Sequence, residues 1–268
     1  MVGPIPILLY HAISAESPPV IRPFAVTPES FRRHLDVVVA SGVTILTISE
    51  LVAARDAAML PARPAAITFD DGFSDFYEIA QPALREHGLR ATLYVATALL
   101  RGCPWSESFP ALGASMLDWS LLQAVAEDGT EIGAHSHTHP HLDTLRRDHA
   151  RDEIVRPKRL LEEELQREVP SFAYPNGYSS AAVRRLVREA GYRSACSVKN
   201  ALSSPDDDRF SLARLTVRAT TSLTELGEWL QGRGAPPALQ RERARTRGWR
   251  LYRRTRAAAT GRPTSDLR

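Results

Sequence analysis

The sequence predicts an α/β fold built on a parallel β-sheet. Short apolar, β-favouring runs alternate with helical patterns along most of the chain, which is the order expected for repeated β–α units. Two polar motifs, at residues 68–75 and 135–139, each follow the end of such an apolar run. Because the carboxyl ends of parallel strands lie on one face of the fold, we expect the two motifs to meet there.

The predicted strands and helices alternate from the first apolar run to about residue 230. Thr27 followed by Pro28 is a helix start signal, and Gly42 follows the end of the same helical pattern. Pro157 is expected to bend the longest helix. In chain order, the predicted strands lie near residues 7–13, 43–46, 65–69, 91–95, 131–134, 192–198 and 215–217, and the predicted helices near residues 27–40, 47–56, 74–88, 118–128, 142–168, 179–191 and 222–230.

The two motifs supply the side chains that a hydrolytic metal site requires. Asp70 and Asp71 are adjacent, and His135 and His139 are four residues apart. One carboxylate can bind a cation while its neighbour takes a proton from water. Alone, paired acids after a strand are often a turn or a helix cap, and histidines in loops are common. Their joint placement at strand ends favours the metal site.

These motifs resemble those of the polysaccharide deacetylase family, the NodB-homology domain of carbohydrate esterase family 4. The resemblance is carried by TFDDG at residues 68–72, by HSHTH followed by Pro140, by FAYPNG at residues 172–177 and by the opening run at residues 7–13, and it spans about residues 5–230. It implies a distorted, incomplete (β/α) barrel of seven or eight parallel strands. It also implies metal-dependent hydrolysis of an N-acyl group, most commonly N-acetyl, on an amino sugar in a saccharide, oligosaccharide or lipid-linked glycan.

The resemblance assigns roles to the motif residues. Asp70 would be the general base, and Asp71, His135 and His139 would bind a divalent metal. Zinc is the default for these ligands, and cobalt, nickel, manganese or iron would also fit. The cation would polarise the acyl carbonyl and lower the pKa of a water molecule.

The third motif is expected to line the substrate groove. It consists of Tyr174, Pro175, Asn176 and Gly177, and the backbone N–H of Asn176 would help to hold the oxyanion. Ser136 either orients the loop by hydrogen bonding or is an ordinary turn hydroxyl.

The chain departs from the family pattern in the groups around the catalytic aspartate. Ala173 stands where the family usually has an arginine that tethers the base, and Asn176 where it often has an aromatic residue. We expect Arg214, near the last predicted strand, to take over the role of the lost arginine. It cannot be the general acid, because a guanidinium group does not release a proton near neutral pH.

The usual general acid is also missing. No clear match to the fourth motif occurs at residues 197–200, and no histidine follows His149 to supply the late leucine–histidine motif, although Leu212 fits its leucine. His11 ends the first predicted strand and is our candidate acid, whereas His137 and His141 are expected at the rim. A chain with a weak acid could still cleave esters, so O-deacetylation or hydrolysis of a non-sugar amide remains an alternative. A non-catalytic carbohydrate-binding relative is a third interpretation, but it predicts a damaged metal site.

The charge distribution divides the chain at about residue 232. We expect a catalytic barrel over residues 1–232 and a Pro/Gly linker with a flexible basic tail over residues 233–268. Residues 241–268 contain ten arginines and two acidic residues, a net charge of +8, and the whole chain carries +3, so residues 1–240 carry −5. Arginines interleaved with Trp249 and Tyr252 suit an anionic membrane surface better than nucleic acid, and a solubilising disordered tail is the simpler alternative.

The remaining features point to the cytoplasm. The apolar run near the start is short and lacks a preceding basic residue, so it reads as a strand and not as a signal peptide. No apolar stretch approaches the roughly 18 residues of a membrane span. Cys103 and Cys196 fit no metal-ligand spacing and are expected to be free thiols, with one buried disulfide as the alternative. Trp105 and Phe109, in a long loop after a strand, either stack on sugar or pack against the barrel edge.

Overall fold

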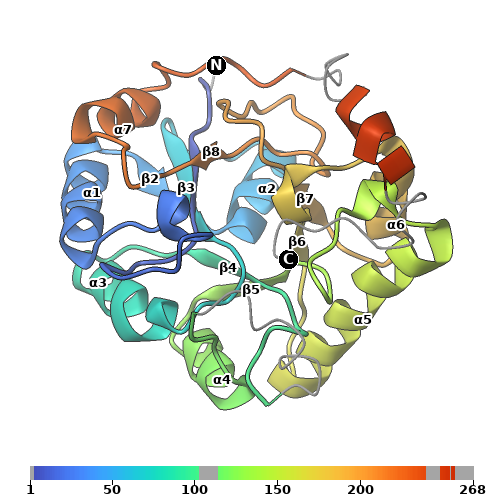
Figure 1. Cartoon of the computed structure of the whole chain (residues 1–268). Helices are drawn as coiled ribbons and strands as arrows, with labels where there is room; N and C mark the ends of the chain where they lie inside the picture. Colours follow the sequence, from blue (N-terminus) through green and yellow to red (C-terminus); the bar gives the residue numbers. More distant parts are fainter. Residues whose placement is uncertain (1–2, 103–113, 240–247, 254, 257–268) are drawn as a thin grey trace.

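The structure is a computed structural model that describes residues 3–102, 114–239, 248–253 and 255–256. One parallel sheet forms its centre, and helices surround that sheet (Figure 1). Trp105, Phe109 and Cys103 lie outside the described residues. The strands are β1 (Ile7–Tyr10), β2 (Thr44–Ile45), β3 (Pro64–Phe69), β4 (Thr92–Val95), β5 (Glu131–Ala134), β6 (Ser171–Ala173), β7 (Ser194–Cys196) and β8 (Leu215–Thr216).

The sheet curves into a distorted barrel. Its strand order is β7-β6-β5-β4-β3-β1-β8, and β2 pairs with the start of β3. Leu212 pairs in parallel with Cys196 of β7, and three residues later Leu215 pairs with Leu8 of β1. The short segment 212–216 therefore joins the two edges of the sheet. The predicted α/β barrel is confirmed, and all of its strands point their carboxyl ends the same way.

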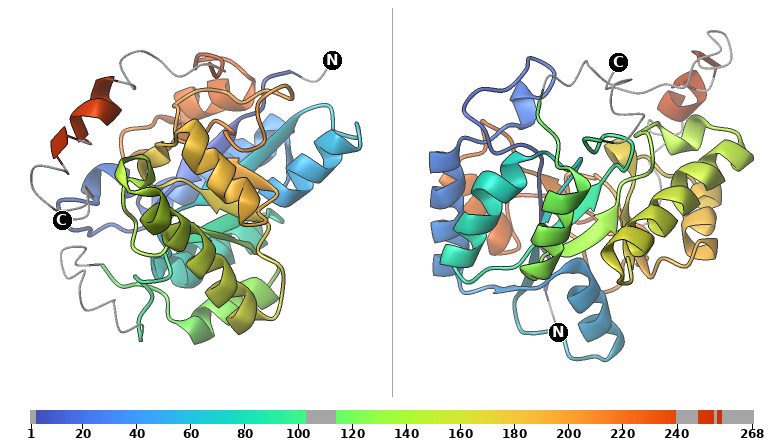
Figure 2. Two further views of the ribbon diagram at one scale, coloured as in Figure 1. Left: turned by 90° about the vertical axis from the view of Figure 1, so that its right-hand side faces the viewer. Right: turned by 90° about the horizontal axis from the view of Figure 1, so that it is seen from below.

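Five of the described α-helices begin at a residue whose side chain caps them, and Thr27 is the start signal that the sequence predicts for the first. The side chain of Thr27 accepts a hydrogen bond from Ser30 N, and Thr47 forms a capping box with Glu50. Asp118, Ser180 and Ser222 cap three later helices in the same way. The helices are α1 (Pro28–Ser41), α2 (Ile48–Asp56), α3 (Gln81–Glu86), α4 (Trp119–Glu127), α5 (Arg147–Leu165), α6 (Ala181–Glu189) and α7 (Leu223–Leu230), and Figure 2 shows them around the sheet.

Two predicted helices differ from the structure at their starts. The helix expected over residues 74–88 begins as a turn of π-helix, η2 (Phe76–Ala80), which continues into α3. The helix expected from residue 142 begins at Arg147 and is preceded by a separate 3₁₀ turn, η5 (Leu142–Thr144). The sequence analysis also missed β6, which is three residues long and too short to give a periodic pattern.

The segment predicted to be a flexible linker is hydrogen-bonded to the barrel. Leu202 N donates to Pro236 O, and Ala238 N donates to Leu202 O, both at 2.9 Å. The division of the chain at residue 232 stays a prediction, but the described residues after it contact the barrel. None of the helices formed by the described residues is long and apolar enough to cross a membrane.

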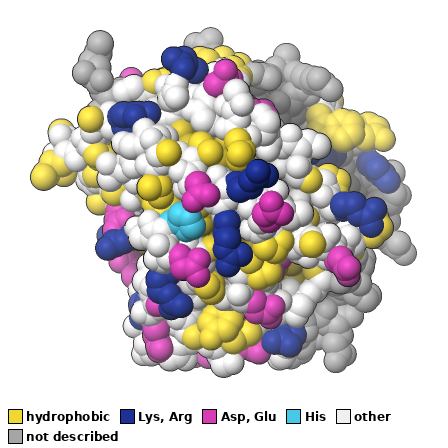
Figure 3. Space-filling view, turned by 90° about the vertical axis from the view of Figure 1, so that its left-hand side faces the viewer, with side chains coloured by type: hydrophobic (Ala, Val, Ile, Leu, Met, Phe, Trp, Pro, Cys, Tyr) yellow, Lys and Arg dark blue, Asp and Glu magenta, His cyan; other side chains and the backbone are white. Residues whose placement is uncertain are grey.

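Charged side chains of both signs are mixed on the face that Figure 3 shows. Helices α1 and α3 carry an exposed ion pair between them, Arg32 with Glu86 at 4.0 Å. Exposed pairs of this kind contribute little to stability, typically below about 1 kcal/mol. Because positive and negative side chains are mixed, the face shown in Figure 3 carries no large patch of one charge.

Candidate active site

The two adjacent aspartates follow β3 at a sharp turn of the backbone. Asp70 N still donates to Tyr10 O at 3.1 Å and so continues the pairing of β3 with β1. Asp71 and Gly72 then adopt positive φ angles of 76° and 92°. A non-glycine residue in this region is strained, and such strain is concentrated at functional sites. The consecutive carboxylates thereby turn apart, Asp70 toward Arg214 and Asp71 toward His139, with His135 close to both.

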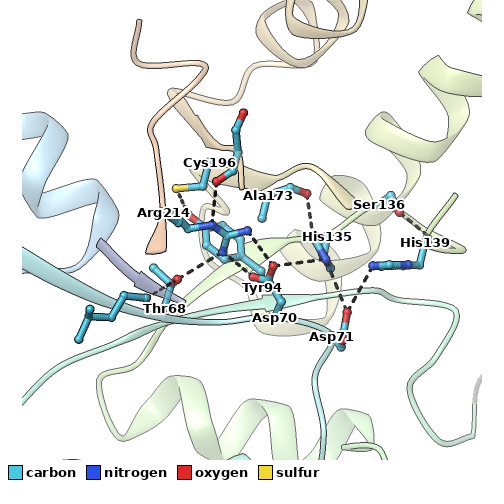
Figure 4. Close-up of polar contacts among 12 residues, drawn as sticks. Thr68, Asp70, Asp71, Tyr94, His135, Ser136, His139, Ala173, Cys196 and Arg214 are labelled. Atoms are coloured by element: carbon cyan, nitrogen blue, oxygen red, sulfur yellow. Dashed lines mark hydrogen bonds and ion pairs between the residues drawn. The ribbon is translucent and has the colours of Figure 1, made fainter. Parts of the chain in front are cut away.

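Asp70 is bound bidentately by Arg214 and also lies close to His135, whose Nε2 is 3.6 Å from Asp70 Oδ2. Nη1 and Nη2 of Arg214 donate to the two carboxylate oxygens of Asp70 at 2.6 and 2.7 Å (Figure 4). Both side chains are buried, and Arg214 is fully buried. Burial raises the pKa of Asp70, but the charges of Arg214 and His135 and the hydrogen bonds of Arg214 outweigh it and lower the pKa from 3.8 to about 2. Asp70 is therefore ionised at neutral pH, and its partner is the arginine that the sequence analysis named.

Other buried groups hold Arg214 in place. Its Nη1 also lies 3.3 Å from Thr68 Oγ1, and its Nε donates to Ser197 O at 3.3 Å. The guanidinium carbon lies 5.4 Å from the ring centroid of Tyr94 on β4. No local sequence pattern marks these groups, because they come from separate segments of the chain that only the folded barrel brings around one arginine.

Asp71 lies on the other side of the site with the two histidines. Its Oδ1 is 3.6 Å from His135 Nε2 and 3.4 Å from His139 Nε2. One ligand atom from each residue lies within 4.8 Å of the others, and all three residues are buried. Burial raises the pKa of Asp71, and Asp71 Oδ1 has no hydrogen-bond partner among the described residues.

These three residues fit a divalent metal ion. Ligand atoms about 2.1 Å from a tetrahedral zinc lie about 3.4 Å from one another, close to the separations between Asp71 and the histidines. A buried carboxylate oxygen without a hydrogen bond is costly unless a cation compensates it. One carboxylate and two imidazoles also suit cobalt, nickel, manganese or iron.

The orientation of the His135 ring is fixed by a hydrogen bond at its Nδ1. Its Nδ1 lies 2.8 Å from the carbonyl oxygen of Ala173, which can only accept, so Nδ1 carries the proton and Nε2 offers its lone pair to the site. Burial lowers the pKa of His135 to about 4, so the ring is neutral at pH 7. Ala173, where the family usually has arginine, thus contributes through its backbone.

The loop that carries the histidines is held by two side chains. Ser136 and His139 both have positive φ angles, 64° and 59°, and His139 N donates to Ser136 Oγ at 3.0 Å. The hydroxyl of Ser136 thus bonds within its own loop, three residues along, as an ordinary turn hydroxyl does. Glu153 of α5 accepts from His137 N and Thr138 N at 2.9 and 2.8 Å, a contact that the sequence analysis missed.

The third motif forms a tight turn beside β6, but its tyrosine does not face the groove. Tyr174 is fully buried, and its hydroxyl donates to Phe210 O at 3.0 Å, so its side chain links the turn to the segment that contains Phe210. Pro175 is buried as well. Asn176 has a φ of 56°, and a Cβ at Gly177 would lie 2.3 Å from Val198 N, so this position requires glycine. Of the four motif residues, Asn176 remains the candidate oxyanion donor.

His11 follows β1, on the same face as the aspartates. Its ring packs on Phe24 with centroids 5.1 Å apart, and its Nδ1 is buried without a hydrogen-bond partner among the described residues. A positive charge on His11 acts on both Asp70 and Asp71 and lowers their pKa values. His11 therefore lies within electrostatic reach of both carboxylates, and its role as the acid stays a prediction.

Cys196 lies beneath the site as a free, buried thiol. Its Sγ is 3.4 Å from the hydroxyl of Tyr94, and burial raises the pKa of the thiol to about 11. A protonated thiol at this depth is a packing group.

Comparison with known proteins finds a matching family and several relatives. The family model for polysaccharide deacetylases matches residues 58–195. Bacillus subtilis YxkH, which carries the name of a polysaccharide deacetylase, is 23% identical over 233 residues, covering 85% of this chain and 76% of YxkH. The poly-β-1,6-N-acetyl-D-glucosamine N-deacetylase of Staphylococcus epidermidis is 23% identical over 220 residues, covering 78% and 73%. The structure of the Streptococcus pyogenes deacetylase PplD in complex with acetate is similar at a TM-score of 0.73, with 26% identity over 84% of this chain and 97% of PplD.

Proposed function

Because the chain belongs to the polysaccharide deacetylase family, we propose that it is a metal-dependent hydrolase that removes an N-acetyl group from an amino sugar. The substrate would be a saccharide, an oligosaccharide or a lipid-linked glycan. One observation carries the proposal: of two adjacent carboxylates that both lie 3.6 Å from His135 Nε2, Asp70 is bound by Arg214 and Asp71 faces His139. A hydrolase needs this division between a free base and a metal ligand.

The chain's own residues supply most of the reaction. Asp70, kept ionised by Arg214, takes a proton from the attacking water. The N–H of Asn176 donates to the oxyanion as the acyl carbon becomes tetrahedral. His11 then donates a proton to the departing amine, and acetate leaves. A divalent cation bound by Asp71, His135 and His139, zinc by default, would polarise the carbonyl and lower the pKa of water.

Two relatives support the acetyl group and the amino sugar. The Staphylococcus epidermidis relative is named for poly-β-1,6-N-acetyl-D-glucosamine, and the Streptococcus pyogenes structure holds acetate. We therefore favour a β-linked N-acetylglucosamine oligomer as the first substrate to test.

The test is acetate release with zinc or cobalt supplied and with a chelator as control. Substrates are N-acetylglucosamine as the free sugar, the sugar nucleotide, β-1,4 and β-1,6 oligomers and a lipid-linked form, beside a simple acetyl ester. Chelator-sensitive release from an amino sugar, absent in Asp70→Asn, would support the proposal. Release from the ester alone would favour the O-acetyl esterase alternative, which the lack of a late histidine leaves open. No release from any of them would contradict N-deacetylation.

We also propose that the basic tail contacts an anionic membrane surface. Trp249, Leu251 and Tyr252 are exposed, and the rings of Trp249 and Tyr252 stack 5.1 Å apart. Aromatic residues among arginines suit the headgroup region of anionic lipid. Sedimentation with vesicles containing phosphatidylglycerol, lost in Trp249→Ser and at high salt, would support this contact. Equal binding to neutral vesicles would contradict it.

A further inference from the structure

One arginine of the basic tail is buried against the barrel. Residues 248–253 and 255–256 are helical and are drawn in red at the edge of the molecule in Figures 1 and 2. Within this segment Arg253 is 3% exposed, whereas Trp249, Leu251 and Tyr252 are 47%, 65% and 52% exposed. A residue buried in this way must have partners that replace water.

Arg253 has two such partners, from two different loops. Its Nη1 and Nη2 donate to Asp143 Oδ1 and Oδ2 at 3.0 and 3.1 Å, and Asp143 is itself 2% exposed. On its flat face, the guanidinium carbon lies 3.8 Å from the ring centroid of Tyr178. A planar fork that binds a carboxylate and stacks on an aromatic ring is specific to arginine, because lysine offers a point charge.

Each partner adjoins a part of the candidate active site. Asp143 lies in η5, four residues after the metal ligand His139. Tyr178 directly follows the turn Pro175–Gly177 and lies two residues after Asn176. His141, between His139 and Asp143, packs edge-on to Tyr178 with ring centroids 5.5 Å apart. Arg253 therefore joins the loop that bears a metal ligand to the loop that bears the candidate oxyanion donor.

We propose that Arg253 is a positioning residue that fixes these two loops relative to each other and so makes the tail part of the working enzyme. The proposal rests on the proposed function for its kinetic consequence, but the joining of the loops is independent of it. Apolar residues often stabilise a fold as well as a buried ion pair does. In some proteins such a pair instead specifies how the segments that it joins are arranged.

Hydrogen exchange of the full chain tests the joining of the loops. Arg253→Ala should increase amide exchange in peptides that cover residues 140–145 and 176–180, besides the tail itself. Arg253→Lys should give a smaller increase, and Arg159→Ala, which removes an exposed arginine on α5, should give none at these sites. Increased exchange confined to the tail would overturn the proposal, because the loops would then keep their order without Arg253.

Kinetic measurements test whether Arg253 affects catalysis. At a temperature where circular dichroism shows all variants folded, Arg253→Ala should lower kcat by about tenfold, the lower end of the effect of outer groups that orient metal ligands, with little change in KM. Asp143→Asn should match it, the double variant should be no worse, and Arg253→Lys should recover part of the loss. An unchanged kcat in Arg253→Ala would overturn the positioning role. If the wild-type protein releases no acetate from any substrate, the proposed function fails, and hydrogen exchange alone decides whether Arg253 joins the loops.

Discussion

Asp70 and Asp71 are neighbours in sequence, yet the two sides of the site compensate their charges in opposite ways. On the Asp70 side, Arg214 supplies a bidentate cation from within the protein, and the pKa of Asp70 falls to about 2. On the Asp71 side, the nearest groups are two histidines, one of them held neutral, and burial raises the pKa of Asp71. The charge of Asp70 is compensated by a cation of the protein itself, whereas the Asp71 side, which shares His135 with it, fits an added cation.

The largest expected effect comes from breaking the Asp71 side. Asp71→Ala should abolish metal binding and lower kcat by about 10⁴-fold, since loss of several kcal/mol of transition-state stabilisation corresponds to that factor. Metal content by mass spectrometry and acetate release are the measurements. A variant that still binds metal with the affinity of the wild type would remove Asp71 from the ligand set.

Asp70→Asn should distinguish the function of Asp70 from that of Asp71, because it should lower turnover without removing the metal. We expect kcat to fall by about 10³-fold, within the range of general-base catalysis, because an amide cannot accept the proton of water. One metal ion should remain bound per chain. Loss of the metal with Asn at position 70 would mean that the roles of the two aspartates are exchanged.

His11→Ala tests the proposal that His11 is the general acid. Amide cleavage should fall by about 10²-fold while cleavage of an activated acetyl ester changes little, because a good leaving group needs no proton. Comparing kcat for an N-acetyl sugar and an ester gives the result. Equal effects on both substrates would exclude His11 as the acid.

Arg214→Lys should have the smallest effect on turnover and a clear effect on stability. Lysine cannot form the bidentate pair, so we expect a loss of about tenfold in kcat and of about 2 kcal/mol in the free energy of unfolding at pH 7. The pKa of Asp70 is lowered on folding, so the stabilisation is present above its unfolded value of 3.8 and is lost as the pH falls through about 2. Urea unfolding should show the gap between the two proteins narrowing below pH 4, and a constant gap would contradict the pairing.

The sequence predicts what is local in the chain. The β–α alternation, the helix caps at Thr27 and Asp118 and the two site motifs could all be recognised because each depends on residues close together in sequence. The positive φ angles of Asp71 and His139 are set by the surrounding barrel and leave no pattern. The turn at Asp71, which directs one carboxylate toward Arg214 and the next toward His139, therefore becomes visible only in three dimensions.

The burial of Arg253 in the basic tail could not be predicted from the sequence for the same reason. Its composition predicts a free basic segment, because ten arginines in 28 residues look solvated. The partner of Arg253 lies 110 residues away, on a loop whose position depends on the folded barrel. The burial of Tyr174 is similar, since its hydroxyl reaches a carbonyl 36 residues further along the chain.

The most direct test is anomalous X-ray diffraction from crystals soaked in zinc, measured at the zinc absorption edge. The account predicts one strong peak within bonding distance of Asp71, His135 and His139, with Asp70 still paired to Arg214. A peak bonded to Asp70, or no peak among these residues, would contradict the division between the two sides of the site.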